Sequence, residues 1–178
     1  ILDTSIAASP ITIREGIDFG GLLSAADLNT LNDATTGLIT VDVDWNADGE
    51  GGDDTTITGI TGSYSDVHDA LTADSADGTH GSNPQTITGI EAAGMTVTLT
   101  GTVTVAQLND IVNNYTTGVV TATISDTDMA TLDDLTTTVG AYTVTVADTN
   151  VQTDTLDTLD GDTLSLIHIS EPTRRQQI

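Results

Sequence analysis

Apolar residues alternate with polar ones in several short segments of this chain, and this pattern predicts strands. In residues 119–124 and 142–146, apolar side chains take every second position and threonine lies between them. An alternation of period two places one set of side chains in a core and the other in water. The same pattern predicts a strand over 38–45, with Ile39, Val41, Val43 and Trp45 on one face, and another over 95–100, with Val97 and Leu99 inward.

Other segments have the spacing of amphipathic helices. Ser24-x-x-Asp27 is a variant of the capping box that begins many helices, and Thr104-x-x-Gln107 is a complete one. Each predicted helix is followed by Thr-Thr-Gly, at 35–37 and at 116–118, where a left-handed glycine can end it. The inward positions are Leu28, Leu31 and Ala34 in the first helix and Leu108, Ile111, Val112 and Tyr115 in the second. A short helix is also predicted over 65–71. A further helix, capped by Asp126 or Thr127, has Met129, Leu132 and Leu135 inward.

A spacing of 24 residues relates these segments to one another. Leu108, Leu132 and Leu156 are 24 residues apart, and so are the pairs Val120/Val144, Thr121/Thr145 and Ala122/Val146. A fixed period of this size is typical of repeat proteins. The sequence therefore predicts an α/β repeat of short helix–strand units in a single-sheet, solenoid-like arrangement. The alternative is an all-β, immunoglobulin-like sandwich with helical turns.

The regular spacing does not extend over the whole chain, and this suggests four regions. Residues 1–23 form a partial preceding unit, and 24–103 form a first repeat unit with an acidic loop insertion. Residues 104–163 contain the regular repeats. Residues 164–178 differ from the rest in composition. A shorter echo, in which 56–60 (TITGI) recurs as 86–90, falls within the second region.

The charge of the chain limits the classes of partner that it is expected to bind. Among 178 residues there are 23 Asp, 4 Glu and 36 Thr but only 3 Arg and no Lys, and the formal net charge is −24. Nucleic acids and anionic membranes bind basic surfaces, so the composition argues against both, and cations are the natural partners. No apolar run is long enough to span a bilayer, and cysteine is absent, so stacking or metal must replace disulfides.

One acidic segment has the pattern of a calcium loop. Residues 44–49 read D-x-N-x-D-G, the first half of an EF-hand loop, in which alternate side-chain oxygens converge on one hard cation. Thr55 stands where such loops place a bidentate Glu. Two interpretations remain open, a solvated acidic hairpin loop and a Ca²⁺ site formed by Asp44, Asn46, Asp48, Glu50, Asp53 and Asp54.

The remaining polar clusters are interpreted structurally. Asp126, Asp128, Asp133 and Asp134, and likewise Asp74-x-x-Asp77-Gly78, are expected to be helix caps and turn residues. His68 is assigned to a helix and His80 to a loop; two histidines without cysteine are weak grounds for zinc. The T-x-T segments are expected to form a solvated strand face, with an ice-binding ladder as the alternative. The chain contains no recognisable catalytic motif, so an enzyme is not expected.

The segments 105–109, 117–126 and 141–149 resemble the repeats of very large secreted bacterial surface proteins, notably marine and cyanobacterial ones. That resemblance implies a structural or adhesive module, extracellular or at the cell surface, whose partners are neighbouring repeats, a cell-surface polymer or other cells. A non-catalytic accessory region of a secreted hydrolase is the alternative. The calcium nonapeptide G-G-x-G-x-D is missing.

The last region, residues 164–178, does not resemble a natural protein segment. Residues 164–174 (LSLIHISEPTR) are similar to the in-frame translation of a transposase-type sequencing adapter, and 175–178 would continue it. The alternative is a natural edge strand over 166–169. Under the adapter interpretation, residues 1–163 are native and carry one Arg and 26 acidic residues, a formal charge of −25.

Overall fold

The computed structural model describes residues 9–13, 21–42, 57–74, 86–90, 94–135, 140–148, 159 and 167–169. Its helices are α1 (Ala25–Ala34), α2 (Tyr64–Asp74), α3 (Val105–Asn114) and α4 (Met129–Leu132). Its strands are β1 (Ile11–Ile13), β2 (Leu22–Ser24), β3 (Ile39–Val41), β4 (Gly59–Gly62), β5 (Ile87–Thr88), β6 (Thr96–Val103), β7 (Val120–Ile124), β8 (Ala141–Val146) and β9 (Ile167–Ile169).

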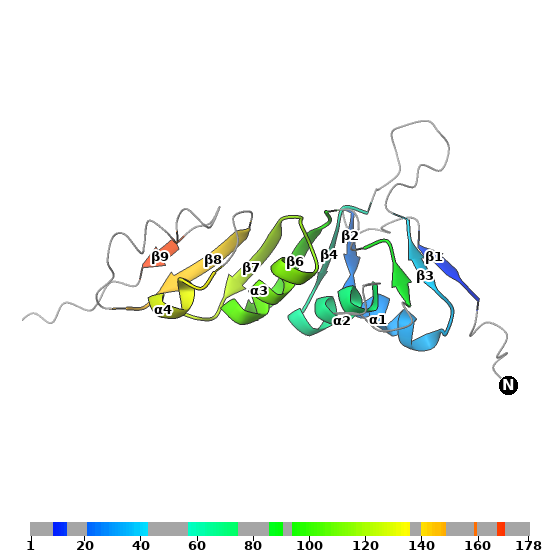
Figure 1. Cartoon of the computed structure of the whole chain (residues 1–178), viewed down its shortest axis with the longest axis horizontal. Helices are drawn as coiled ribbons and strands as arrows, with labels where there is room; N and C mark the ends of the chain where they lie inside the picture. Colours follow the sequence, from blue (N-terminus) through cyan, green and yellow to red (C-terminus); the bar gives the residue numbers. More distant parts are fainter. Residues whose placement is uncertain are drawn as a thin grey trace, which may run out of the picture.

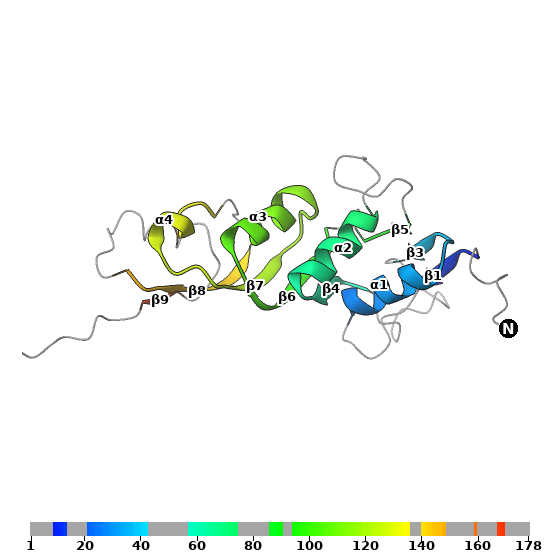
Figure 2. The same cartoon turned by 90° about the horizontal axis from the view of Figure 1, so that it is seen from below.

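The described strands form two parallel sheets. One sheet has the order β1-β3-β5, and the other has the order β2-β4-β6-β7-β8-β9. The six-stranded sheet follows the long axis of the molecule, and α3 and α4 lie on the same side of it (Figures 1 and 2). The predicted α/β class is confirmed. The immunoglobulin-like alternative is disfavoured, because such sandwiches are built from antiparallel strands and every described pairing here is parallel.

The two halves of the chain use their helices differently. In the first half, α1 leads from β2 to β3 and α2 leads from β4 to β5, so each helix connects the six-stranded sheet to the three-stranded one. In the second half, α3 leads from β6 to β7 within the same sheet. The recurring TITGI segments therefore have different places, since Ile60 lies in β4 of one sheet and Ile87 in β5 of the other.

The strand register differs from the predicted spacing of 24 residues. Thr121 pairs with Ala141, and Thr123 pairs with Thr143, so β7 and β8 are offset by 20 residues. In the first half, Leu22 pairs with Gly59 and Gly59 with Thr96, an offset of 37. Residues 24 apart, such as Thr121 and Thr145, are thus not register partners. A slip by an even number of residues leaves the inward and outward faces unchanged, which is why the alternation alone could not select the register.

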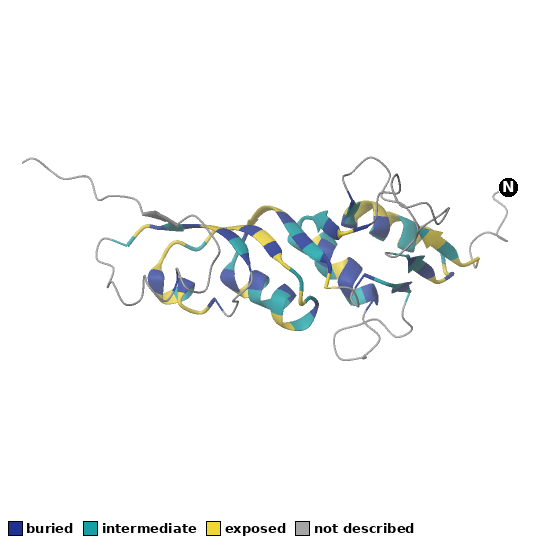
Figure 3. Cartoon of the chain, turned by 90° about the horizontal axis from the view of Figure 1, so that it is seen from above, coloured by how far each residue is buried: buried dark blue, intermediate teal, exposed yellow. Residues whose placement is uncertain are grey.

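Most of the predicted inward positions are buried, but Leu31 and Val112 are half-buried and Ala34 is exposed, so the inward position predicted for Ala34 is wrong. Leu108 and Ile111 in α3 are fully buried, Tyr115 is nearly so, and Leu132 in α4 is fully buried. Val97 and Leu99 point into the core from β6, and β7 alternates strictly between buried and exposed residues, a pattern visible in Figure 3. Burial of these side chains supplies the main driving force for packing the helices on the sheet.

The helix starts follow the predicted capping chemistry. Ser24 accepts a hydrogen bond from the Asp27 N–H at 3.3 Å, and Thr104 and Gln107 form the complete capping box at α3. The cap of α4 is Asp128, so both caps predicted for this helix, Asp126 and Thr127, are wrong. Helix α2 begins at Tyr64 and ends at Asp74, so it is longer than the predicted 65–71.

The Thr-Thr-Gly segments end helices in another way than predicted. Positive φ angles occur at Gly21, Gly89, Gly94 and Gly101 among the described glycines, so the left-handed conformation expected for Gly37 is wrong. Instead, the Gly37 N–H donates to Thr35 Oγ1 at 3.0 Å, and the Gly118 N–H donates to Thr116 Oγ1 at 2.9 Å. Gly118 is required for another reason: a Cβ there would collide with the carbonyl oxygens of Gly94 and Met95.

The end of the described chain contains a strand where the alternative interpretation expects one. Strand β9 pairs in parallel with β8, with Val144 opposite Ile167 and Val146 opposite Ile169. Leu159 is helical and buried, as the helix predicted after Thr153 requires, and Leu156 lies outside the described residues. The structure thus shows residues 167–169 as a strand, which is compatible with both an adapter origin and a natural origin of this segment.

Candidate functional site

The predicted calcium loop cannot be placed. Asp44, Asn46, Asp48, Glu50, Asp53 and Asp54 all lie outside the described residues. Asp42 ends the described segment before it, and its N–H donates to the Ile13 carbonyl at 2.8 Å, which fixes the start of the loop to the three-stranded sheet. Within the described part of the chain, His, Asp and Glu side chains form no group of three or more that could hold a metal ion.

The second acidic cluster contains helix caps and residues at the end of a helix, in agreement with the structural role predicted for it. Asp128 Oδ1 accepts from the Thr131 N–H at 3.0 Å and from the Thr131 hydroxyl at 2.9 Å. Asp133 follows the last residue of α4, where its own N–H bonds back to the helix. Asp126 has an unexpected partner, because its Oδ2 accepts from the Val105 N–H, the first residue of α3, at 2.7 Å.

This bond belongs to a pattern that we call the seam, the set of side-chain bonds between successive helix–strand units. Asp148, two residues beyond β8, accepts from the Met129 N–H at the start of α4, also at 2.7 Å. Each aspartate thus follows one strand and caps the helix that precedes that strand. The first N–H groups of a helix have no partner within it, and the helix dipole favours a carboxylate there. A unit therefore completes the helix of the unit before it.

Asparagine side chains add a second set of bonds to the seam. Asn29, the fifth residue of α1, donates from Nδ2 to the Asp66 carbonyl oxygen of α2 at 2.9 Å. Asn109, the fifth residue of α3, donates to the carbonyl oxygen of Asp134 at 2.7 Å. Both asparagines follow a fully buried leucine, Leu28 or Leu108. The repeated Leu-Asn pair was the available sequence signal.

A polar cluster bridges α2 and α3. Helix α2 connects the two sheets, whereas α3 connects two strands of the same sheet. The Tyr64 hydroxyl donates to Asp110 Oδ2 at 3.0 Å, and His68 Nε2 lies 3.7 Å from that oxygen and 3.4 Å from the Tyr115 hydroxyl. The Tyr115 hydroxyl is also 3.2 Å from Thr72 Oγ1, and the His68 and Tyr115 rings meet edge to face. Sequence analysis placed His68 on a helix correctly and missed the cluster, because its hydrogen-bonded partners are 43 to 47 residues apart.

The electrostatics of this cluster keep Tyr64 protonated. Burial, followed by the hydrogen bond to Asp110, raises the pKa of Tyr64 to about 12. A neutral phenol that donates to a carboxylate is a stable pairing, because ionising the phenol would place two negative charges side by side. The cluster therefore fastens α2 to α3.

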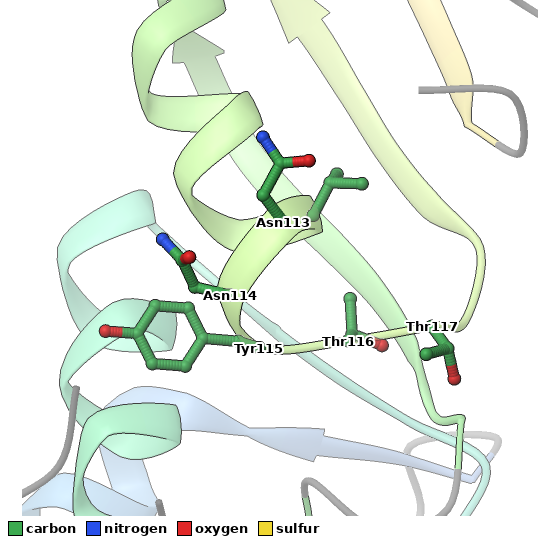
Figure 4. Close-up of a pocket in the computed structure, with 6 residues that line it drawn as sticks. Asn113, Asn114, Tyr115, Thr116 and Thr117 are labelled. Atoms are coloured by element: carbon green, nitrogen blue, oxygen red, sulfur yellow. The ribbon is translucent and has the colours of Figure 1, made fainter. Parts of the chain in front are cut away.

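A hollow of about 240 Å³ lies beside the cluster, at the end of α3. Figure 4 shows that Tyr115 points toward α2, whereas Asn113 and Thr117 point elsewhere, so the lining side chains do not converge on one point. The lining residues come from one continuous segment and are Val112, Asn113, Asn114, Tyr115, Thr116 and Thr117. Ligand sites usually contain convergent polar groups from several elements, and this hollow has none.

Asp74 is the buried acidic residue of the described chain, with 3% of its surface exposed. It is the last residue of α2, and its Oδ2 accepts from the Ile90 N–H at 3.0 Å. The bond holds the segment after β5 against the end of α2. This agrees with the structural role predicted for Asp74, while Asp77, Gly78 and His80 lie outside the described residues.

Threonines occupy the solvent side of the six-stranded sheet. Thr61, Thr98 and Thr121 are register partners in β4, β6 and β7, and Thr102, Thr123 and Thr143 are partners in β6, β7 and β8. The register shifts between Thr98 and Thr102, where Gly101 has φ 78°. The threonine face is defined here by Thr98, Thr100, Thr102, Thr121, Thr123 and Thr143, which are exposed except for the half-buried Thr98.

Comparison with known protein families, with curated proteins and with solved structures finds no match for this chain. Among the described helices, none is both long and apolar enough to cross a membrane. The seam, the α2–α3 cluster and the threonine face are the features of the described chain that bear on its function.

Proposed function

We propose that the chain is a structural and adhesive repeat module of a large secreted or cell-surface bacterial protein. The observation that carries the proposal is the seam. Asp126 and Asp148 cap the helix of the preceding unit, and Asn29 and Asn109 bond to the following one. Contacts of this kind lengthen a molecule by stacking, and repeat proteins gain stability from such nearest-neighbour interfaces. We infer that the sheet is one stretch of a solenoid.

Calcium is the proposed ligand of the module. The net charge of −24 makes carboxylate repulsion a general cost of the folded state, and a cation in the Asp44–Asp54 region would relieve it locally. Extracellular calcium modules bind with dissociation constants of ~0.1–1 mM. At about ten times such a constant, mass action adds about 1.4 kcal/mol to the free energy of unfolding.

A melt in EDTA and in millimolar Ca²⁺ tests this proposal. We expect calcium to raise the melting temperature by roughly 3–6 °C, given ~2–4 °C per kcal/mol for a chain of this size. Magnesium at the same concentration controls for general screening, and Asp48→Ala removes one proposed oxygen ligand. An unchanged midpoint in calcium, or an equal rise in Asp48→Ala, would remove the calcium site from the proposal.

Two other functions remain as alternatives. An accessory region of a secreted hydrolase would be supported by a catalytic domain elsewhere in the same reading frame. Ice binding would use the threonine face, but the register shift between Thr98 and Thr102 interrupts its rows. Thermal hysteresis at high protein concentration would establish ice binding, and its absence would exclude this use.

The adapter interpretation of residues 164–178 is a separate proposal. Its support is the run LSLIHISEPTR, which differs in composition from the acidic, threonine-rich chain before it. A strand at Ile167–Ile169 is compatible with either origin, because any alternating apolar segment can extend an open parallel edge. An independent nucleotide sequence past codon 163 would decide the question: a different continuation supports the adapter, and the same one removes it.

A further inference from the structure

The threonine face differs in charge from the rest of the molecule. Strands β4, β6, β7 and β8 contain no Asp, Glu, Lys, Arg or His, although the chain has 27 acidic residues. The two aspartates that follow β7 and β8 are bonded to helix starts, since Asp126 and Asp148 each accept an N–H at 2.7 Å. The face is therefore an uncharged area on a strongly anionic protein.

This neutrality has a consequence for self-association. Two copies of a chain with a net charge of −24 repel each other across acidic surfaces, and burying unpaired carboxylates between them is costly. A twofold contact brings the same patch of each copy together, so a patch of one charge sign opposes itself, whereas an uncharged patch does not. The threonine methyl and hydroxyl groups can pack and hydrogen bond across such a contact, as cross-strand threonines do within sheets.

We propose that the threonine face binds the threonine face of a second copy of this chain. This inference deepens the adhesive role proposed above by naming its partner, and it rests on that role. Sheets pack face to face at about 10 Å, which requires side chains of moderate size, and threonine meets that requirement. Threonine is also stiff at χ1, so little side-chain freedom is lost on contact.

The size of the face determines the expected strength. The three strands that carry the face are 5 to 8 residues long. At about 4.8 Å between strands and ~3.3 Å per residue, they cover on the order of 200–400 Å². Stable complexes bury about 800 Å² per partner, so one module should associate weakly, with a dissociation constant on the order of 1 mM. Tandem modules would add their contacts, which is how weak repeats produce firm adhesion.

Nuclear magnetic resonance of the ¹⁵N-labelled chain tests the proposal by dilution. The salt concentration is about 1 M, where the Debye length is about 3 Å and repulsion between copies is screened. Between about 0.05 and 2 mM protein, we expect concentration-dependent shifts of the amides of Thr102, Thr121, Thr123 and Thr143, with α3 and α4 unaffected. Thr123→Asp should abolish these shifts. The matched Thr123→Asn keeps the shape without the charge and should retain them, and so should Ala130→Asp, which adds a charge on the exposed side of α4.

Several results would overturn the proposal. They are an absence of shifts at the highest concentration, shifts that map to the helices, and equal shifts in Thr123→Asp and Thr123→Asn. Shifts of the threonine face that appear only on adding a neutral polysaccharide such as dextran would assign the face to that partner instead. The melting experiments on calcium and on the seam are independent of these shifts. If the shifts are absent, the structural module remains as proposed. If the melting experiments fail, the result does not depend on self-association.

Discussion

Removal of the Asp126 carboxylate is the sharpest test of the seam. Asp126 Oδ2 accepts the Val105 N–H at 2.7 Å, and Val105 is 2% exposed, so this bond satisfies a donor that has little contact with water in the folded chain. Loss of a helix cap costs ~0.5–2 kcal/mol, and a buried donor left without a partner costs ~1–3 kcal/mol. Both ranges are costs of losing the same hydrogen bond, so they are not added. We expect Asp126→Ala to lower the free energy of unfolding by about 2 kcal/mol.

The assay is urea and thermal unfolding followed by circular dichroism. A loss of about 2 kcal/mol corresponds to a fall in melting temperature of roughly 4–8 °C for a chain of this length. Asp126→Asn keeps an acceptor and loses only the attraction between charge and helix dipole, so it should cost ~0.3–1 kcal/mol.

The control is Asp133→Ala. Asp133 is exposed at the end of α4, and its removal relieves the same overall repulsion without breaking a described side-chain bond of the seam. We expect it to be neutral or slightly stabilising. If Asp126→Ala destabilises no more than Asp133→Ala, the bond between units contributes nothing and the proposal built on the seam fails.

Four further substitutions test the α2–α3 cluster, two glycines and the asparagine bond of the seam. The pKa of Tyr64 is about 12 in the folded chain against 10.0 in the unfolded one, so between pH 10 and 12 the unfolded state loses its proton first and stability falls. Tyr64→Phe should reduce that fall and remove a phenol that ionises near pH 12 in an absorbance titration. Gly118→Ala should cost ~1–3 kcal/mol because its Cβ meets two carbonyl oxygens, whereas Gly101→Ala has open space and should cost only the ~1–2 kcal/mol of its positive φ; equal midpoints of Gly118→Ala and wild type in urea would contradict the contact. Asn109→Ala should cost about 1 kcal/mol through its lost bond to the Asp134 carbonyl, and an unchanged unfolding midpoint would show that this bond is dispensable.

Local patterns in the sequence determined the elements and their inner faces. The capping box at Thr104 and the helix face through Leu108 and Ile111 depend on residues at most a few positions apart, and both are confirmed. The alternation in β7 likewise placed Val120 and Ile124 in the core. These features follow from the periods of the helix and the strand, which any window of the sequence reveals.

Only the tertiary structure decided how those elements combine. The pairing of Thr121 with Ala141 instead of Thr145 depends on the connection between the strands, since every even offset satisfies the alternation equally well. The partition of the strands into two sheets and the contact of Asp126 with the start of α3 are also non-local. An aspartate next to a helix in sequence looks like the cap of that helix. In the folded chain, however, Asp126 and Asp148 reach the helix of the preceding unit. The reason is that two neighbouring parallel strands end at the same edge of the sheet, where the helix that connects them begins.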